Sequence, residues 1–257
     1  MSPSASWLVV NERSGSNSEA ALRELEASLA RHGLGVARTT EFPAQELPTR
    51  TDLEAAGVSQ LIVFTGDGTL NAVIDAVSGW AGAVLVLPGG TMNLLSGRLH
   101  GEDTPCDAIL ERIARGAFRP VRPAMAACAA GRAHAGLLVG PGTAWAGVRE
   151  AMRDFDVAGL AQGAGEALAE TTGGSRVRMA DPAIGDQNGY PLIELTPSHR
   201  GLQVDGFLLE NAAEFLQQSF AVLRRRFREG PHERLGLLDC LTIEIAHGFT
   251  YPGPGRT

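Results

Sequence analysis

Cysteine is scarce in this sequence, and its spacing excludes two classes of fold. The 257 residues include three cysteines, Cys106, Cys128 and Cys240, which form neither a Cys-x-x-Cys pair nor a Cys/His ligand pattern. A disulfide framework and a zinc site are therefore not expected.

Long apolar runs are also missing, since none reaches the roughly 18–20 residues that span a bilayer. The first residues, MSPSASWLVV, lack a basic segment and a long apolar core, so they do not resemble a signal peptide. We expect a cytoplasmic protein.

Positive charge is scarce as well. With 22 basic and 29 acidic residues the net charge is −7, which argues against a nucleic-acid-binding protein that relies on phosphate contacts. An acidic chain also adsorbs weakly to anionic lipid, although a local basic patch can still act there. The arginine-rich stretch Leu223–Arg228 is such a patch: it is predicted to end a helix, where positive charge suits the helix dipole, and it could also meet lipid headgroups.

The first half of the chain alternates between strand-like and helix-like segments. Short apolar runs predict four strands, at Trp7–Val10, Gly35–Thr40, Leu61–Phe64 and Ala83–Leu87. Helical spacing predicts the helices between and after them, at Glu19–Arg31, Asp52–Ala56, Leu70–Ser78, Leu94–Leu99 and Pro105–Arg115. Ser18 is the expected cap of the first helix. This βαβαβαβ order is typical of a parallel sheet covered by helices on both faces.

The pattern changes after Arg119-Pro120, so we place a domain boundary near residue 120. Residues 1–120 are expected to form an α/β domain and residues 121–257 a strand-rich mixed domain. The first two strands predicted in it are Ala124–Ala130 and Ala133–Val139, joined by a turn at Gly131-Arg132. The later strands are Val177–Met179, Leu192–Leu195, Leu202–Val204 and Leu241–Ala246, and the helices are Thr143–Asp154, Val157–Thr171 and Glu210–Glu229.

The loop after the third predicted strand reads Thr65-Gly66-Asp67-Gly68-Thr69. Gly66 and Gly68 permit positive φ and let backbone N–H groups approach a ligand. Asp67 could hold a metal ion or accept a proton from an attacking hydroxyl. Thr69 could bond a phosphate or cap the next helix. An ordinary tight turn with a helix cap explains the same residues. The loop matches neither the GxGxxG pattern nor Walker A, whose lysine is missing.

Two more loops in the same half carry similar chemistry. Pro88-Gly89-Gly90-Thr91-Met92-Asn93 follows the fourth predicted strand, and Asn93 could bond a ribose or base edge or merely cap a helix. Asn11, Ser14 and Gly15, after the first strand, allow the same two interpretations. In a parallel sheet all three loops would lie at the carboxyl edge, where ligands bind. This convergence favours a site for a phosphate-rich ligand and its metal.

Together the three loops resemble the motifs of the diacylglycerol kinase catalytic domain, which sphingosine kinases and related bacterial lipid kinases share. The motifs have the same order and spacing as in that family: Asn11-x-x-Ser14-Gly15, then Gly66–Thr69, then Pro88–Asn93. The segment Leu94–Gly101 is similar to the family's short helix after the third motif. The resemblance covers about residues 7–100. It implies an NAD-kinase-like α/β domain followed by a β-sandwich-like, lipid-facing domain.

The resemblance also implies a function. It indicates an ATP-dependent lipid kinase that transfers the γ-phosphate to the hydroxyl of a diacylglycerol- or sphingoid-like lipid, with ATP and Mg²⁺ as cofactors. Contact with the membrane surface would be peripheral and transient. Asp67 would take part in the metal and proton network. By the same resemblance, the nucleotide would contact Asn11, Ser14, Gly15, Gly66, Gly68, Thr69, Gly90, Thr91 and Asn93.

The chain departs from the family's pattern in several places. Glu12 replaces a common proline, Thr65 a common glycine and Leu94 a common aspartate. The family's late Asp-Gly-Glu motif, whose acids serve the metal and the general base, does not occur up to Thr257. It could lie beyond that residue. Asp205, followed by Gly-Phe, could substitute for it, but a turn aspartate is the simpler interpretation.

Alternatives to an active lipid kinase therefore stay open. A nucleotide-binding protein of the same fold that has lost transfer activity is favoured by the missing acidic motif. An NAD kinase shares the Gly-Asp-Gly turn, but the Pro-Gly-Gly-Thr-Met-Asn turn argues against it. A Rossmann oxidoreductase would need the glycine fingerprint that this chain lacks.

Overall fold

The chain divides into two compact units in the structure, a computed structural model. One unit comprises Met1–Pro123 and Ala127–Ala135, and the other comprises Ala124–Ala126 and Gly136–Thr257. The predicted domain limits, 1–120 and 121–257, stay a prediction. The residues that the structure describes are 6–11, 14, 18–129, 131–140, 176–207 and 232–246.

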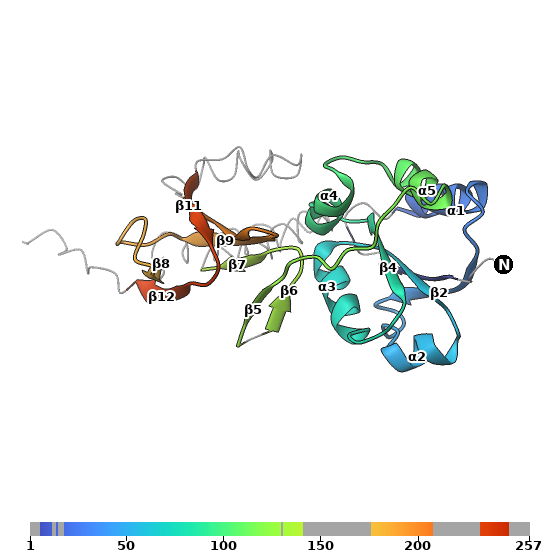
Figure 1. Cartoon of the computed structure of the whole chain (residues 1–257), viewed down its shortest axis with the longest axis horizontal. Helices are drawn as coiled ribbons and strands as arrows, with labels where there is room; N and C mark the ends of the chain where they lie inside the picture. Colours follow the sequence, from blue (N-terminus) through green and yellow to red (C-terminus); the bar gives the residue numbers. More distant parts are fainter. Residues whose placement is uncertain are drawn as a thin grey trace, which may run out of the picture. The chain divides into compact units, whose positions relative to one another are not determined.

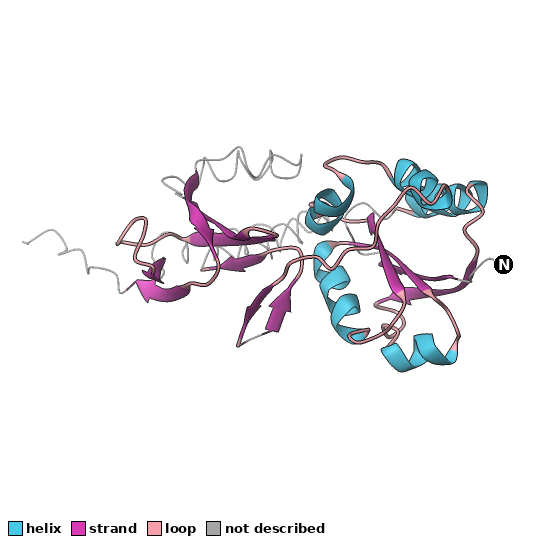
Figure 2. Ribbon diagram, in the orientation of Figure 1, coloured by secondary structure: helices cyan, strands magenta, loops and turns pink. Residues whose placement is uncertain are grey.

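A four-stranded parallel sheet forms the centre of the first unit (Figure 1, Figure 2). Its strands lie in the order β2-β1-β3-β4, with parallel pairing throughout. The strands are β1 Ser6–Asn11, β2 Val36–Phe42, β3 Gln60–Thr65 and β4 Ala83–Pro88. The helices are α1 Glu19–Arg31, α2 Arg50–Ala55, α3 Asp67–Ala76, α4 Leu94–His100 and α5 Cys106–Ala114.

Both faces of this sheet are buried against helices, as the alternating segments predicted. Val9 and Val63 point to one face and pack with Leu70 and Val73 of α3. The residues next along the strands point to the other face, where Ile62, Phe64 and their neighbours pack with apolar residues of α1 and α5. Side chains on a strand alternate between faces, so near-continuous apolar strands are what a doubly covered sheet requires.

Local capping sets where the helices begin. The Ser18 hydroxyl accepts a hydrogen bond from the Ala21 N–H at 3.2 Å, and α1 has the predicted bounds. Helix α3 begins at Asp67, three residues earlier than predicted. The reason is that Gly66 is extended and occupies the N-cap, and its carbonyl accepts the first helical bond, from Leu70. The Asp-Gly-Thr of the loop is therefore the first turn of a helix.

A short hairpin packs onto the first unit although it follows the predicted boundary. It consists of β5 Ala126–Cys128 and β6 Gly131–Ala133. Asn71 of α3 donates to the Arg132 carbonyl and accepts from the His134 N–H, both at 2.9 Å. These bonds explain why Ala127–Ala135 groups with the first unit. The predicted turn at Gly131-Arg132 is wrong, because both residues lie in β6.

The second unit is rich in strands, as expected. An antiparallel sheet has the order β11-β10-β9-β7, and β8 pairs with β12. The strands are β7 Leu137–Val139, β8 Arg176–Asp181, β9 Leu192–Ser198, β10 Gly201–Phe207, β11 His232–Leu238 and β12 Thr242–Ala246. Val177 and Met179 of β8 pack with Ile193, Leu195 and Val204 of the larger sheet, which gives this unit a core of its own.

Some predictions for the second half lie outside the described residues, and one strand was missed. The helices predicted at Thr143–Asp154, Val157–Thr171 and Glu210–Glu229, the last of which includes Leu223–Arg228, fall outside the described ranges. Strand β11 was not predicted. Gly236, at φ 159°, interrupts its alternation, and the register shifts opposite Val204 and Asp205 of β10.

No helix in the described part of the chain is long and apolar enough to cross a membrane.

Candidate active site

Three loops meet at the carboxyl edge of the parallel sheet. They follow β1, β3 and β4, which are neighbours in the sheet and run in the same direction. The loops contain Asn11 and Ser14, then Gly66–Thr69, then Gly89–Asn93. Ligands bind at this edge in open α/β sheets, because the helix N-termini that follow the strands point there. Gly15, also predicted to contact nucleotide, lies outside the described residues.

Two hydrogen bonds connect the first loop to the second. The Asn11 amide, in a residue only 9% exposed, donates to the Thr69 hydroxyl at 2.8 Å. The Ser14 hydroxyl accepts from the Gly66 N–H at 3.0 Å. These bonds hold the first turn of α3 against the end of β1. The side chains of Asn11, Ser14 and Thr69 therefore build the site as well as offering contacts to a ligand.

Asp67 connects the second loop to the third. One oxygen of its carboxylate accepts from the Leu94 N–H at 3.1 Å and the other from the Leu95 N–H at 3.3 Å. These are free N–H groups of the first turn of α4, so the carboxylate caps that helix from 27 residues away. Its proximity to a helix N-terminus is electrostatically favourable.

Burial dominates the electrostatics of Asp67. Desolvation raises the pKa of this carboxyl above its usual value, although backbone hydrogen bonds from Leu94, Leu95 and Asn93 act in the opposite direction. Asp67 forms no ion pair with a described residue. Asp67 is only partly buried, but a desolvated carboxylate without a cationic partner is still costly, so an incoming cation would be bound favourably here.

The third loop is held by its own asparagine. Asn93 has φ 52° and ψ 40°, the left-handed conformation that asparagine tolerates better than most residues. Its side-chain oxygen accepts from the Gly90 N–H at 2.7 Å, and its side-chain nitrogen donates to the Gly90 carbonyl at 2.8 Å. Asn93 therefore closes the loop on itself. Thr91 lies within this closed loop, half-buried.

The glycines of the second and third loops have different reasons to be glycine. A Cβ on Gly90 would lie 2.5 Å from the Gly66 Cα, and one on Gly89 would lie 2.5 Å from the backbone of Phe64 and Thr65. A Cβ on Gly68 would meet no atom of the described residues within 4 Å. Neither Gly66 nor Gly68 uses the positive φ that glycine permits: Gly66 has φ −75°, Gly68 is helical, and Asn93 takes the left-handed conformation instead.

The N-terminus of α3 is suited to a phosphate. Among the described residues no side chain caps it, because Gly66 occupies the N-cap, and none lies within 4 Å of a Cβ placed on Gly68. The first N–H groups of an α-helix lack intrahelical partners and carry the positive end of its dipole. A phosphate placed there would receive these hydrogen bonds without a clash with a Cβ.

The described residues could hold a magnesium ion only together with ligands from a bound phosphate and from water. Among the described residues, no three His, Cys, Asp or Glu side chains cluster in a way that could hold a metal. Mg²⁺ is commonly bound by one or two carboxylates together with substrate phosphates and water. Asp67 supplies one such carboxylate at the edge where the phosphate-binding N–H groups lie.

Asp205 was considered as a substitute for the late acidic motif or, more simply, as a turn residue. The turn interpretation is wrong. Asp205 lies in β10 and is 4% exposed. One of its oxygens accepts from Arg234 at 2.6 Å and the other from Gln203 at 2.6 Å. Both oxygens of this carboxylate are therefore engaged within the second unit, which leaves it poorly placed to accept a proton from a substrate.

Sequence reasoning missed the partners of Asp67. The N–H groups of Leu94 and Leu95 carry no side-chain signature, and they are 27 and 28 residues from the aspartate. One indirect signal was available: an aspartate after a buried strand, followed by a second βα unit, places the next helix N-terminus beside it.

Comparisons with known proteins agree with this architecture. Residues 5–126 match the model of the diacylglycerol kinase catalytic domain. A solved structure from Bacillus anthracis str. Sterne, described as "a putative diacylglycerol kinase", aligns with 94% of this chain and 85% of its own, at 16% identity and a TM-score of 0.52. At this identity the likeness is one of fold. A second structure from that organism, described as a diacylglycerol kinase, covers 95% of this chain and 87% of its own, at 16% identity and a TM-score of 0.48. Curated proteins give no significant match. Over residues 5–126 the chain is therefore similar to the diacylglycerol kinase catalytic domain.

Proposed function

We propose that the chain is an ATP-dependent lipid kinase that transfers the γ-phosphate of ATP to the hydroxyl of a diacylglycerol- or sphingoid-like lipid. The observation that carries the proposal is the connected edge of the sheet, where side chains of one loop hold the backbone of the next. An uncapped helix N-terminus and open space at Gly68 lie at this edge. Phosphoryl transfer depends mainly on positioning and on neutralisation of charge, which such a rigid edge supplies.

The residues at this edge have distinct proposed roles. The phosphates of ATP would contact the N–H groups of the first turn of α3, including those of Gly68 and Thr69. Gly66 and Gly90 would let the nucleotide approach the backbone, and Thr91 would offer a hydroxyl from the third loop. Asn11, Ser14 and Asn93 would hold these groups in place through the bonds described above.

Asp67 is the proposed ligand of Mg²⁺ and a member of the proton network. When bound, the ion would neutralise charge on the phosphates. The partly buried carboxylate, which has no ion-pair partner among the described residues, supports this assignment, because a cation would offset the cost of its desolvation.

A second candidate is a protein of the same family that binds nucleotide without transferring phosphate. The observation that favours it is Asp205, whose carboxylate is occupied by Arg234 and Gln203 and is therefore unavailable as a replacement for the missing Asp-Gly-Glu acids. An NAD kinase is a third and weaker candidate.

One assay separates the three candidates. Radiolabelled ATP with Mg²⁺ would be incubated with diacylglycerol, with sphingosine and with NAD, while binding of ATP is followed by thermal shift. Transfer to a lipid is expected, and Asp67→Asn is expected to abolish it with the fold retained. Asp75→Asn, which removes an exposed carboxylate from the same helix, is the matched control and should keep activity. Binding without transfer would favour the inactive protein, and transfer to NAD alone would favour the NAD kinase.

A further inference from the structure

A basic stretch follows the last helix of the first unit. Residues 112–125, RIARGAFRPVRPAM, contain four arginines and no acidic residue, in a chain whose net charge is −7. The stretch starts in the last turn of α5, and residues 117–125 form neither helix nor strand (Figure 2). Positive charge is thus concentrated where the rest of the chain is acidic.

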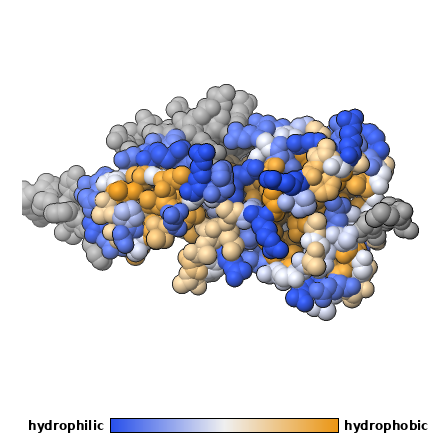
Figure 3. Space-filling view, viewed as in Figure 1, coloured by the Kyte–Doolittle hydropathy of each residue, from blue (hydrophilic) through white to orange (hydrophobic). Residues whose placement is uncertain are grey.

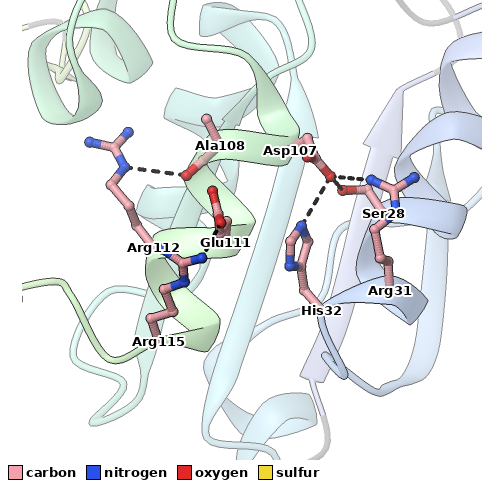
Figure 4. Close-up of polar contacts among 8 residues, drawn as sticks. All are labelled: Ser28, Arg31, His32, Asp107, Ala108, Glu111, Arg112 and Arg115. Carbon is pink, nitrogen blue, oxygen red and sulfur yellow. Dashed lines mark hydrogen bonds and ion pairs between the residues drawn. The ribbon is translucent and has the colours of Figure 1, made fainter.

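Two of the four arginines have local partners and two do not. Arg115 pairs with Glu111 at 2.6 Å, and Arg112 donates to the Ala108 carbonyl at 3.3 Å (Figure 4). Arg119 and Arg122 make no hydrogen bond or ion pair with the described residues. All four side chains are exposed. The charges of Arg119 and Arg122 are therefore available to an anionic partner.

Two large apolar side chains are exposed between these arginines. Phe118 and Val121, both in the first unit, are each 53% exposed. They are two of the six exposed large hydrophobic residues in the described part of the chain, and they are three positions apart in the sequence. In the view of Figure 3, surface hydrophobic residues of the first unit are bordered by hydrophilic ones. Such clustering marks a contact surface more often than scattered exposure does.

The prolines of the stretch bear on the kind of partner. Pro120 and Pro123 have no N–H, so the stretch cannot present a complete row of donors to the edge strand of a partner protein. Nucleic acid would use the arginines but would leave the aliphatic side chain of Val121 in water. A lipid interface accepts both kinds of side chain at once, since headgroups attract arginine and the acyl boundary receives apolar groups.

We infer that residues 112–125 dock the protein on an anionic membrane surface. Arg119 and Arg122 contact phosphate headgroups, and Phe118 and Val121 enter the boundary with the acyl chains. A membrane is also where the lipid acceptor of the proposed kinase would lie, and to that extent the choice of partner rests on the proposed function.

Vesicle binding of the full-length protein, without ATP, tests the inference. Vesicles of phosphatidylcholine mixed with phosphatidylglycerol are compared with vesicles of phosphatidylcholine alone in a sedimentation assay. The wild type is expected to bind the anionic vesicles at least about tenfold more tightly. Arg119→Gln with Arg122→Gln is expected to weaken that binding about thirtyfold, since each basic residue contributes close to a factor of five. Phe118→Ser with Val121→Ser is expected to weaken binding to the same vesicles at all salt concentrations.

Two control variants match these changes. Arg132→Gln with Arg200→Gln removes the same charge from exposed positions outside the stretch, and Leu237→Ser with Ile245→Ser removes exposed apolar side chains elsewhere. Both should bind within about threefold of the wild type. Equal losses in the test and control variants would overturn the inference, as would absence of vesicle binding. Displacement from vesicles by single-stranded RNA at lower concentration than by lipid would assign the stretch to nucleic acid instead.

A second readout separates this inference from the kinase proposal. Transfer to a short-chain acceptor lipid in detergent micelles requires no docking on a vesicle, so the Arg119→Gln/Arg122→Gln variant should retain the wild-type rate there. If vesicle binding depends on the stretch and no transfer occurs, the docking surface stands and the proposed function fails. If transfer occurs and the substitutions do not affect vesicle binding, the proposed function stands and the docking surface fails.

Discussion

The loop after β3 and the loop after β4 are both rich in glycine, yet their glycines meet different surroundings. Gly89 and Gly90 lie against the backbone of the neighbouring loop, where a Cβ would approach other atoms to 2.5 Å. Gly68 faces open space at the uncapped start of α3. The comparison separates two reasons for a glycine: one makes room for the protein's own chain, and the other leaves room for something the chain does not contain. Gly90→Ala and Gly68→Ala test this difference directly, and substitutions of Asn93 and Asp67 test the contacts that hold the two loops. The four are given in order of falling effect on the free energy of unfolding.

Gly90→Ala is expected to have the largest effect. The new Cβ would collide with the Gly66 backbone, which cannot move without displacing the start of α3, so we expect a loss of about 3 kcal/mol. Urea denaturation followed by circular dichroism measures it. Gly97→Ala is the control, because a Cβ at that helical position meets atoms no closer than 3.9 Å. Wild-type stability in Gly90→Ala would show that the two loops are not in contact.

Asn93→Ala should rank second, at about 2 kcal/mol. It removes both hydrogen bonds to Gly90 and leaves a residue with a Cβ in the left-handed conformation. Asn93→Gly loses the bonds but accepts that conformation readily, so it should be less destabilised. Equal denaturation midpoints for the two variants would remove backbone strain from the explanation.

Asp67→Asn should alter the pH dependence of stability. Because burial raises the pKa of Asp67 in the folded state, its contribution to stability is fully present below the unfolded pKa and is lost as pH rises through the folded pKa. The wild type should therefore gain stability relative to the variant on acidification from about pH 7 to about pH 4. Urea denaturation across this range measures the difference. A profile for Asp67→Asn parallel to that of the wild type would contradict the burial argument.

Gly68→Ala should have the smallest effect on stability and a large one on binding. Alanine is a better helix former and meets no atom there, so we expect the free energy of unfolding to rise by about 0.5 kcal/mol. Affinity for ATP with Mg²⁺, measured by calorimetry, should fall at least about tenfold, because the methyl group would occupy the proposed phosphate site. Unchanged affinity would move that site away from Gly68.

The sequence predicted the first unit better than the second for a physical reason. Helix α1 and strand β4 follow from apolar spacing and from caps such as Ser18, which act over a few residues. Strand β11 was missed, because its pairing with β10 contains an irregular register and Gly236. Asp205 was mistaken for a turn residue because Asp-Gly is a turn signal. Its partner Arg234 lies 29 residues away on the neighbouring strand β11, so the pairing leaves no local signal.

By itself the sequence determined the order of strands and helices in the parallel sheet and the three loops that follow β1, β3 and β4, because periodicity and turn chemistry are local. Only the tertiary structure decided which contacts those loops make with one another. Asn11 reaches Thr69, Asp67 caps α4, and Gly90 makes room for Gly66. These contacts join residues 24 or more positions apart, and their geometry depends on how parallel strands align at one edge.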